Sequence, residues 1–144
     1  MSATVCRAWA VDLGPRELYE LLRLRVDVFV VEQRCPYPEL DGRDLAPSTV
    51  HVWLADGSAV ASYLRVLGEP SGAARVGRVC TAVPYRGRGL SAQLVASALD
   101  LVGDRPCVLD AQSYLVGFYG RFGFTPTGPE YVEDGIPHVP MRLG

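Results

Sequence analysis

Residues 79–91 read Val-Cys-Thr-Ala-Val-Pro-Tyr-Arg-Gly-Arg-Gly-Leu-Ser, and this stretch decides the fold. Apolar residues before it predict a strand over residues 74–82, and the apolar spacing after it predicts a helix over residues 89–102. Glycines at such a junction allow a sharp turn and leave backbone N–H groups exposed at the positive end of the helix. This nest suits a phosphate, and Arg86 and Arg88 add positive charge to it. For these residues alone, a glycine-rich turn with two solvated arginines is an equally good interpretation.

The rest of the chain predicts an α+β domain with one core. Runs of apolar residues are separated by turn signals, and Asp56-Gly57 is a strong signal for a hairpin. We expect strands over residues 5–11, 50–54, 59–67, 74–82, 107–109, 124–127 and 138–143, and helices over residues 15–31, 89–102 and 114–122. A meander followed by alternating strands and helices places the later strands in parallel through a right-handed crossover. The length suits a single domain over residues 1–144.

Composition removes several functional classes. All 14 basic residues are arginine, so the chain has no Schiff-base lysine, no Ser-x-x-Lys dyad and no Walker-type lysine. A formal net charge of −2 argues against a nucleic-acid partner. The sequence contains no apolar run long enough to span a membrane, and its first residues do not resemble a signal peptide. We therefore expect a cytoplasmic protein without a membrane partner. The widely spaced cysteines and histidines predict neither a metal site nor a disulfide framework.

Two motifs resemble signatures of the GNAT superfamily of N-acetyltransferases. The segment Arg86-x-x-Gly89-x-Ser91 is similar to the Arg/Gln-x-x-Gly-x-Gly/Ala loop that binds the pyrophosphate of acetyl-coenzyme A (acetyl-CoA). Residues 118–124, Phe-Tyr-Gly-Arg-Phe-Gly-Phe, are similar to the family's aromatic-Tyr-x-x-x-Gly-Phe segment. Three further blocks, at residues 29–37, 41–44 and 133–138, resemble the ElaA-like branch of the superfamily. The resemblance implies the acyl-CoA N-acyltransferase fold, a mixed and mostly antiparallel sheet with two splayed parallel strands, flanked by helices.

The resemblance also implies which residues contact acetyl-CoA, the expected co-substrate, with no metal required. The main chain of the last strand residues would align the pantetheine and thioester, and the loop and helix start would hold the pyrophosphate. This set comprises Val79, Cys80, Thr81, Arg86, Gly87, Arg88, Gly89, Leu90, Ser91, Ala92, Gln112 and Tyr119. Ser91 departs from the family's Gly/Ala, and its hydroxyl could bond the phosphates or crowd them. Gln112 stands where many members carry an asparagine.

Acyl transfer to an amine requires a group that accepts the ammonium proton and a group that protonates the leaving thiolate. Tyr119 matches the family's usual acid, although a tyrosine packed on the cofactor or core is the alternative. The position of a glutamate base in some members is held here by Cys107. Glu32 and His138 are the leading candidates for a base, and a structural or substrate-orienting role for either is equally compatible with the sequence. Asp110, Glu133 and a relaying water remain as further candidates. A covalent route through Cys80 is disfavoured because no histidine or carboxylate is tied to it in the sequence.

The ElaA-like blocks are expected to wall the acceptor pocket, and their acidic residues suit a cationic amine. The pocket residues are Phe29, Glu32, Gln33, Asp41, Glu133, Asp134 and His138. The resemblance therefore implies an acetyl-CoA-dependent N-acetyltransferase that acts on a primary amine of a small molecule, peptide or protein in a ternary complex. A non-catalytic acyl-CoA binding or sensing module is the alternative. A homodimer is open, because many relatives pair but no hydrophobic stripe in this chain requires it.

Overall fold

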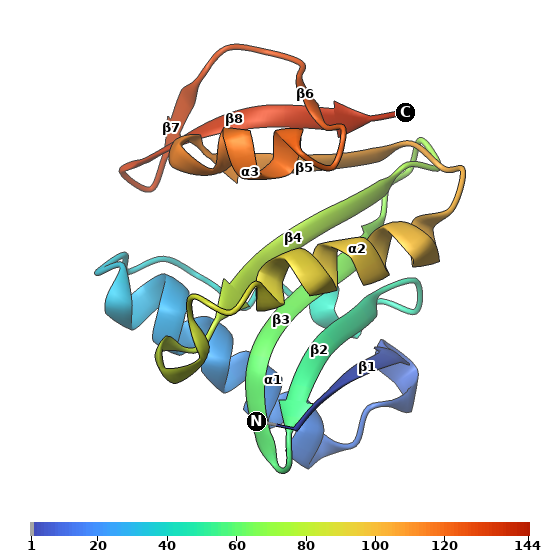
Figure 1. Ribbon diagram of the computed structural model, residues 1–144, viewed down its shortest axis with the longest axis vertical. Helices are drawn as coiled ribbons and strands as arrows, with labels where there is room; N and C mark the ends of the chain where they lie inside the picture. The colour runs from blue at the N-terminus through green and yellow to red at the C-terminus, as the bar shows by residue number, and fades with distance from the viewer. Residues whose placement is uncertain (1) are drawn as a thin grey trace.

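The computed structural model describes residues 2–144 and shows one continuous sheet (Figure 1). The strand order is β1-β2-β3-β4-β5-β8-β6, with β7 paired to β8. The strands are β1 (Ala3–Trp9), β2 (Val50–Asp56), β3 (Ala59–Gly68), β4 (Ala74–Thr81), β5 (Cys107–Gln112), β6 (Thr125–Pro126), β7 (Tyr131–Glu133) and β8 (Ile136–Leu143). The α-helices are α1 (Pro15–Val26), α2 (Leu90–Val102) and α3 (Val116–Gly120). Short helices are η1 (Ala10–Asp12), η2 (Asp27–Glu32), η3 (Arg43–Leu45), η4 (Val83–Tyr85) and η5 (Ser113–Leu115), of which η2 is a π-helix.

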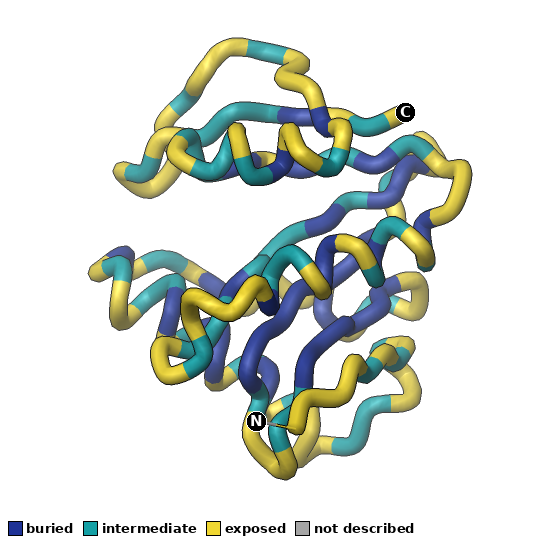
Figure 2. Tube along the Cα trace, in the orientation of Figure 1, coloured by how far each residue is buried: buried dark blue, intermediate teal, exposed yellow. Residues whose placement is uncertain are grey.

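The helices α1 and α2 cover opposite faces of the first half of the sheet. Val52 and Leu54 of β2 face the α2 side with Leu94, whereas Trp53 faces the α1 side with Leu21. This alternation follows from the two-residue period of a strand. Figure 2 shows that the resulting core runs through β2 and β3, while β1 forms a largely exposed edge.

The sheet opens between β4 and β5, its one parallel pair of strands. Only Ala74 and Arg75 of β4 pair with β5, opposite Cys107 and Val108, and beyond this point the two strands diverge (Figure 1). The crossover helix α2 connects them, as the sequence predicts. The half of the sheet after the gap consists of β5, β8, β6 and β7, packed against α3.

Several predicted boundaries were wrong. The helix expected over residues 15–31 becomes a π-helix at Asp27, and the helix expected over residues 114–122 divides into η5 and α3. The strand expected over residues 107–109 continues to Gln112 because β8 pairs with all of it. The last strand begins at Ile136 because it forms a hairpin with the unpredicted β7, whose turn places Asp134 and Gly135 at positive φ. The first strand ends at Trp9, where Ala10 turns to donate its N–H to the Thr49 carbonyl.

A cluster of buried charges ties α1 to β3 and to the loop before β2. Arg25 of α1 is 0% exposed and pairs with Asp44 and, at 2.5 Å, with Glu39. Arg65 of β3 lies 3.0 Å from Asp44 and 2.6 Å from Asp41. Since buried charges are tolerated only when they are paired and hydrogen-bonded, these contacts fix the loop of residues 39–44 in one position.

Candidate active site

The divergence of β4 from β5 creates a cavity of about 1100 Å³. Its walls come from β4, the loop that leads into α2, β5, α3, the end of η2 and the β7–β8 hairpin. Every residue predicted to contact the cofactor except Arg88 lines this cavity. Of the predicted acceptor-pocket residues, all line it: Phe29, Glu32, Gln33, Asp41, Glu133, Asp134 and His138.

The loop before α2 has the geometry of an anion-binding nest. Gly87 and Gly89 have φ values of +79° and +71°, in the left-handed region that other residues rarely adopt. Gly89 is the residue preceding α2, and within residues 2–144 no side chain caps the first turn of that helix. Its N–H groups therefore remain open at the positive end of the helix dipole. A Cβ atom at either glycine would meet nothing within 4 Å, so the space in front of the loop is clear.

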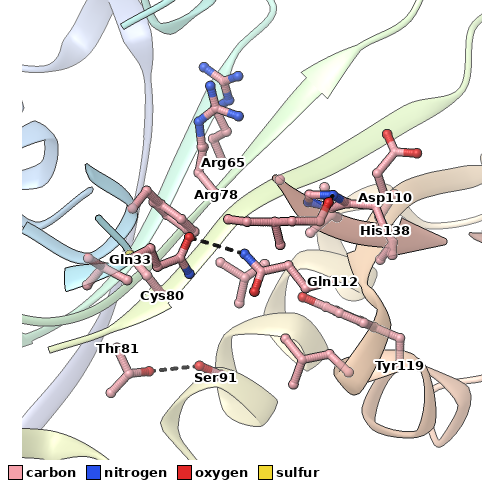
Figure 3. A pocket seen from close by; sticks show the side chains of 18 of the residues that line it. Gln33, Arg65, Arg78, Cys80, Thr81, Ser91, Asp110, Gln112, Tyr119 and His138 are labelled. Atoms are coloured by element: carbon pink, nitrogen blue, oxygen red, sulfur yellow. Dashed lines mark hydrogen bonds between the residues drawn. The ribbon is translucent and has the colours of Figure 1, made fainter. Parts of the chain in front are cut away.

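A chain of hydroxyl groups fixes the helix start to the sheet and orients Ser91. Ser62 donates to the Cys80 carbonyl at 2.9 Å, and its oxygen lies 2.9 Å from the Thr81 hydroxyl. Thr81 in turn lies 2.7 Å from the Ser91 hydroxyl (Figure 3). Because each hydroxyl has one proton, Thr81 must donate to Ser62 and Ser91 must donate to Thr81. The Ser91 proton is thus directed to Thr81 of β4 and not to the space in front of the loop.

The backbone of β4 is irregular where the thioester is expected. Arg78 has a φ of +54°, and the β3–β4 register shifts between Tyr63 and Arg65. Cys80 and Thr81 pair with β3, but among residues 2–144 Val79 has no register partner on either neighbouring strand. This bulge leaves the main chains of Arg78 and Val79 outside the β3–β4 ladder, and both residues line the cavity.

Arg86 and Glu32, which both line the cavity, form a bidentate ion pair that is partly exposed to solvent. Arg86 donates from Nη1 and Nη2 to the two Glu32 carboxylate oxygens at 2.7 and 2.6 Å. Its Nε also donates to the Thr81 carbonyl at 3.0 Å. The hydrogen bond from Arg86 lowers the pKa of Glu32, which makes this carboxylate a poorer proton acceptor.

Tyr119 lies on α3 with its hydroxyl directed into the cavity (Figure 3). The residue is 5% exposed and packs edge-on against Phe118 and Phe124. Burial raises its pKa, so the phenol keeps its proton through the neutral range. A buried, protonated phenol facing the cavity is suited to donate a proton to a leaving thiolate.

Cys80 of β4 also lines the cavity but is unsuited to nucleophilic chemistry. Its thiol is buried, and burial raises its pKa. Because the thiolate is the reactive form, this environment suppresses attack by Cys80 on a thioester.

His138 of β8 has one ring nitrogen committed to the backbone. Its Nδ1 lies 2.8 Å from the Ile136 carbonyl oxygen, and since a carbonyl only accepts, Nδ1 carries the proton. The neutral ring therefore has its lone pair on Nε2. The ring stacks on Tyr131, with centroids 5.7 Å apart. Burial, then a hydrogen bond to Asp110, raises the pKa of Tyr131 to about 12.

The other carboxylates proposed as bases differ in their surroundings. Asp110 of β5 is held by Arg75, whose Nη1 lies 2.6 Å from its Oδ2. Glu133 and Asp134 are exposed on the β7–β8 hairpin, where they add negative charge to the cavity.

Two contacts bridge the gap between the halves of the sheet. Gln112 of β5 donates to the Gln33 side chain at 3.5 Å, as Figure 3 shows. The Cys35 thiol donates to the Asp134 carbonyl at 3.3 Å. The segment after η2 therefore touches both β5 and the β7–β8 hairpin, and it encloses this part of the cavity.

Sequence reasoning missed the arginines of this cavity. Arg65, Arg75 and Arg78 line it, and each is paired with a carboxylate. Asp41 is not a free acceptor-binding carboxylate, because Arg65 holds it and lowers its pKa. Asp44, from the block expected to wall the pocket, is buried in the charge cluster and is not part of the lining. The signal available in the sequence was the position of these arginines on strands that consist mainly of apolar residues.

Comparisons with known proteins agree with this geometry. Residues 25–144 match the model of the acetyltransferase (GNAT) domain. A UPF0039 protein of Mycobacterium tuberculosis is 53% identical over 98% of this chain and 93% of its own length. The protein ElaA of Escherichia coli is 39% identical over 90% of this chain and 89% of its own length.

Solved structures show the same fold. The crystal structure of Escherichia coli ElaA superposes with a TM-score of 0.94 at 34% identity and covers 99% of this chain and 100% of that one. An acyl-CoA N-acyltransferase from Pseudomonas aeruginosa gives a TM-score of 0.92 at 41% identity, with the same coverage. Within residues 2–144, every helix is too short or too polar to span a bilayer.

Proposed function

This chain belongs to the GNAT acetyltransferase family of acyl-CoA-dependent acyltransferases, and from that premise we propose that it transfers an acetyl group from acetyl-CoA to a primary amine. One observation carries the proposal: the uncapped start of α2, with Gly87 and Gly89 in the left-handed region, opens into the same cavity as Tyr119. That arrangement offers an anion site and a proton donor on one cavity.

The chain's own groups fit the donor substrate. The backbone N–H groups from Gly87 to Ala92 would hold the pyrophosphate at the helix N-terminus. The main chain of β4 at Val79 would pair with the pantetheine arm and polarise the thioester carbonyl by a fixed N–H dipole. Since the Ser91 hydroxyl is turned towards Thr81, it leaves this path clear.

The transfer itself needs two proton movements. The amine nitrogen forms a bond to the thioester carbon as the carbon–sulfur bond breaks. His138 Nε2 would take the proton that the amine loses, and the Tyr119 hydroxyl would give a proton to the leaving sulfur. The products are the N-acetylated amine and free CoA, and solvent returns both groups to their starting protonation states.

The direct experiment incubates the protein with acetyl-CoA and a panel of small amines, amino acids and peptides, and measures free thiol and acetylated product. We expect free CoA and product in equal amounts with at least one cationic primary amine. A protein that binds CoA but releases none with any member of the panel would instead be a non-catalytic acyl-CoA binding module.

Substituting His138 by glutamine tests the base. We expect kcat/KM for the amine to fall by about 10²-fold, the lower end of what general base catalysis contributes. The other histidine, His51, is buried against Tyr63 and Asp44, so it cannot replace it. An unchanged kcat/KM for the amine in the variant would contradict the assignment.

Substituting Tyr119 by phenylalanine tests the acid. We expect kcat to fall by about 10²-fold while the Kd of CoA changes by less than about two-fold. Because burial raises the pKa of Tyr119, the ratio of wild-type to variant kcat should be constant from neutral to mildly alkaline pH. Tyr19→Phe on the exposed face of α1 is the matched control. Full turnover by Tyr119→Phe would refute the role.

A further inference from the structure

Glu32 and Arg86 make a contact that the proposed mechanism does not use. They are 54 residues apart, one at the end of η2 and the other in the loop before α2. Both oxygens of the Glu32 carboxylate accept hydrogen bonds from the two Nη atoms of Arg86. A parallel two-bond geometry fixes direction as well as distance, so it orients the guanidinium in a way that a single contact would not.

Three of the five N–H donors of Arg86 bond protein partners. Besides the two bonds to Glu32, its Nε donates to the Thr81 carbonyl at the end of β4. One side chain therefore joins the loop to β4 and to η2 at once. The charge of the guanidinium is balanced by Glu32, so a pyrophosphate in the nest would depend chiefly on the backbone N–H groups at the start of α2.

A second contact, made by Tyr85, anchors the start of the loop. The Tyr85 hydroxyl donates to Asp56 of the β2–β3 hairpin at 2.7 Å. Gly87 and Gly89 follow immediately, both in the left-handed region. Without such anchors, a glycine can readily adopt other backbone conformations. The anchors at Tyr85 and Arg86 therefore limit the conformations of the flexible residues that form the nest.

The partner helix is itself part of the acceptor wall. In η2 and just after it, Gln33 and Cys35 donate backbone N–H groups to carbonyls five residues earlier, at Val28 and Val30. Gln33 then contacts Gln112 across the cavity. The end of η2, which binds Arg86 through Glu32, thus also leads to Gln33, the residue that contacts Gln112 of β5.

We propose that Glu32 is a positioning residue for the acyl-CoA site: by holding Arg86 against η2 and β4, it keeps the loop of residues 86–91 in its anion-binding conformation. It acts through Arg86 and takes no proton from the acceptor. The inference rests on the proposed function only in placing CoA at this loop. Because Glu32 is exposed and its partner belongs to the loop, its loss should affect CoA binding more than folding.

The test is a double-mutant cycle on CoA affinity, measured by isothermal titration calorimetry with Glu32→Gln, Arg86→Gln and the double variant. An exposed ion pair contributes about 0.2–1 kcal/mol, so we expect each single variant to raise the Kd of CoA by about 1.4- to five-fold. We expect the Kd of the double variant to lie within about two-fold of the Kd of the weaker-binding single variant, because both substitutions remove the same interaction. The unliganded Tm should stay within about 1 °C of wild type. Glu20→Gln, which removes an exposed carboxylate 3.9 Å from Arg23, is the matched control and should leave the Kd unchanged.

Three results would overturn the proposal. An unchanged or lower Kd in Glu32→Gln would show that the pair does not support CoA binding. Multiplicative effects in the double variant would show that the two residues act separately. Loss of the pH dependence of turnover in Glu32→Gln, with the Kd unchanged, would identify Glu32 as the base. Since the cycle measures binding alone, a protein that binds CoA but transfers no acetyl group would contradict the proposed function and leave this inference standing.

Discussion

We expect the replacement of Gly89 by glutamate to abolish the thermal stabilisation that CoA would give to the protein. A ligand at 100 times its Kd stabilises the folded state by about 2.7 kcal/mol, which amounts to a shift of several degrees in Tm for a domain of this size. The new carboxylate would stand in the open space in front of the α2 N-terminus and repel the pyrophosphate. It would also force a side-chain-bearing residue to adopt a φ of +71°. We expect the Kd of CoA to rise by more than about 10³-fold, because the variant loses the nest and adds a like charge.

Gly57→Glu is the matched control for this variant. Gly57 lies in the β2–β3 turn at a φ of +59°, and a Cβ atom there also meets nothing within 4 Å. The two variants therefore share the backbone cost and the added charge, and only Gly89→Glu alters the nest. Differential scanning fluorimetry with and without CoA compares them directly. A folded Gly89→Glu protein with the wild-type shift would show that CoA binds elsewhere.

Replacing Arg25 with methionine should lower the free energy of unfolding by about 3–5 kcal/mol, the range expected when one partner of a buried ion pair is removed. Methionine fills much of the volume of the side chain, so the dominant cost is electrostatic. Glu39 and Asp44 would keep their buried charges and lose their partner on α1, although Arg78 would still contact Glu39 and Arg65 would still contact Asp44. Urea denaturation at pH 7, followed by circular dichroism, measures the change.

Arg23→Met provides the comparison, because Arg23 lies on the same helix but is exposed, with Glu20 3.9 Å away. Its effect should stay within about 0.5 kcal/mol. A loss below about 1 kcal/mol in Arg25→Met would show that the buried carboxylates are protonated or reached by water, and that the cluster does not hold the 39–44 loop.

The main features of the site could be predicted because they are local in sequence. A strand, a glycine-arginine turn and an apolar helix are contiguous between Ala74 and Val102, and their order alone requires a parallel partner for β4. The gap between β4 and β5 could be expected only from the resemblance. Pairing that stops after Arg75 depends on the bulge at Arg78 and on how β8 holds β5, and neither is encoded in one segment.

The role of the helix end at Glu32 could not be predicted from periodicity. The apolar spacing over residues 15–31 is compatible with an α-helix throughout, yet the chain widens into a π-turn from Asp27. The i to i+5 hydrogen bonds at Gln33 and Cys35 go together with long-range contacts to Gln112 and Asp134. Tertiary contacts of this kind override local preference, and they determine which side chains face the cavity.

The buried charge cluster has a signal in the sequence that could have predicted it. Arg25 stands between Leu24 and Val28 on the apolar stripe of α1, where an exposed arginine would not be expected. The ElaA-like resemblance predicts that the block at residues 41–44 walls the acceptor pocket, and its acidic residues suit a cationic amine. Asp44 pairs with Arg25 and Asp41 pairs with Arg65, so the negative charge that would face the proposed acceptor comes mainly from the β7–β8 hairpin.

The central claim, that acyl-CoA occupies the gap between β4 and β5 with its pyrophosphate at the start of α2, is tested most directly by a crystal structure with acetyl-CoA bound. We predict pyrophosphate oxygens within hydrogen-bonding distance of the backbone N–H groups between Gly87 and Ala92, and the thioester between Val79 and the Tyr119 hydroxyl. A structure with the pyrophosphate bound away from this loop, or with the thioester out of reach of Tyr119, would contradict the account.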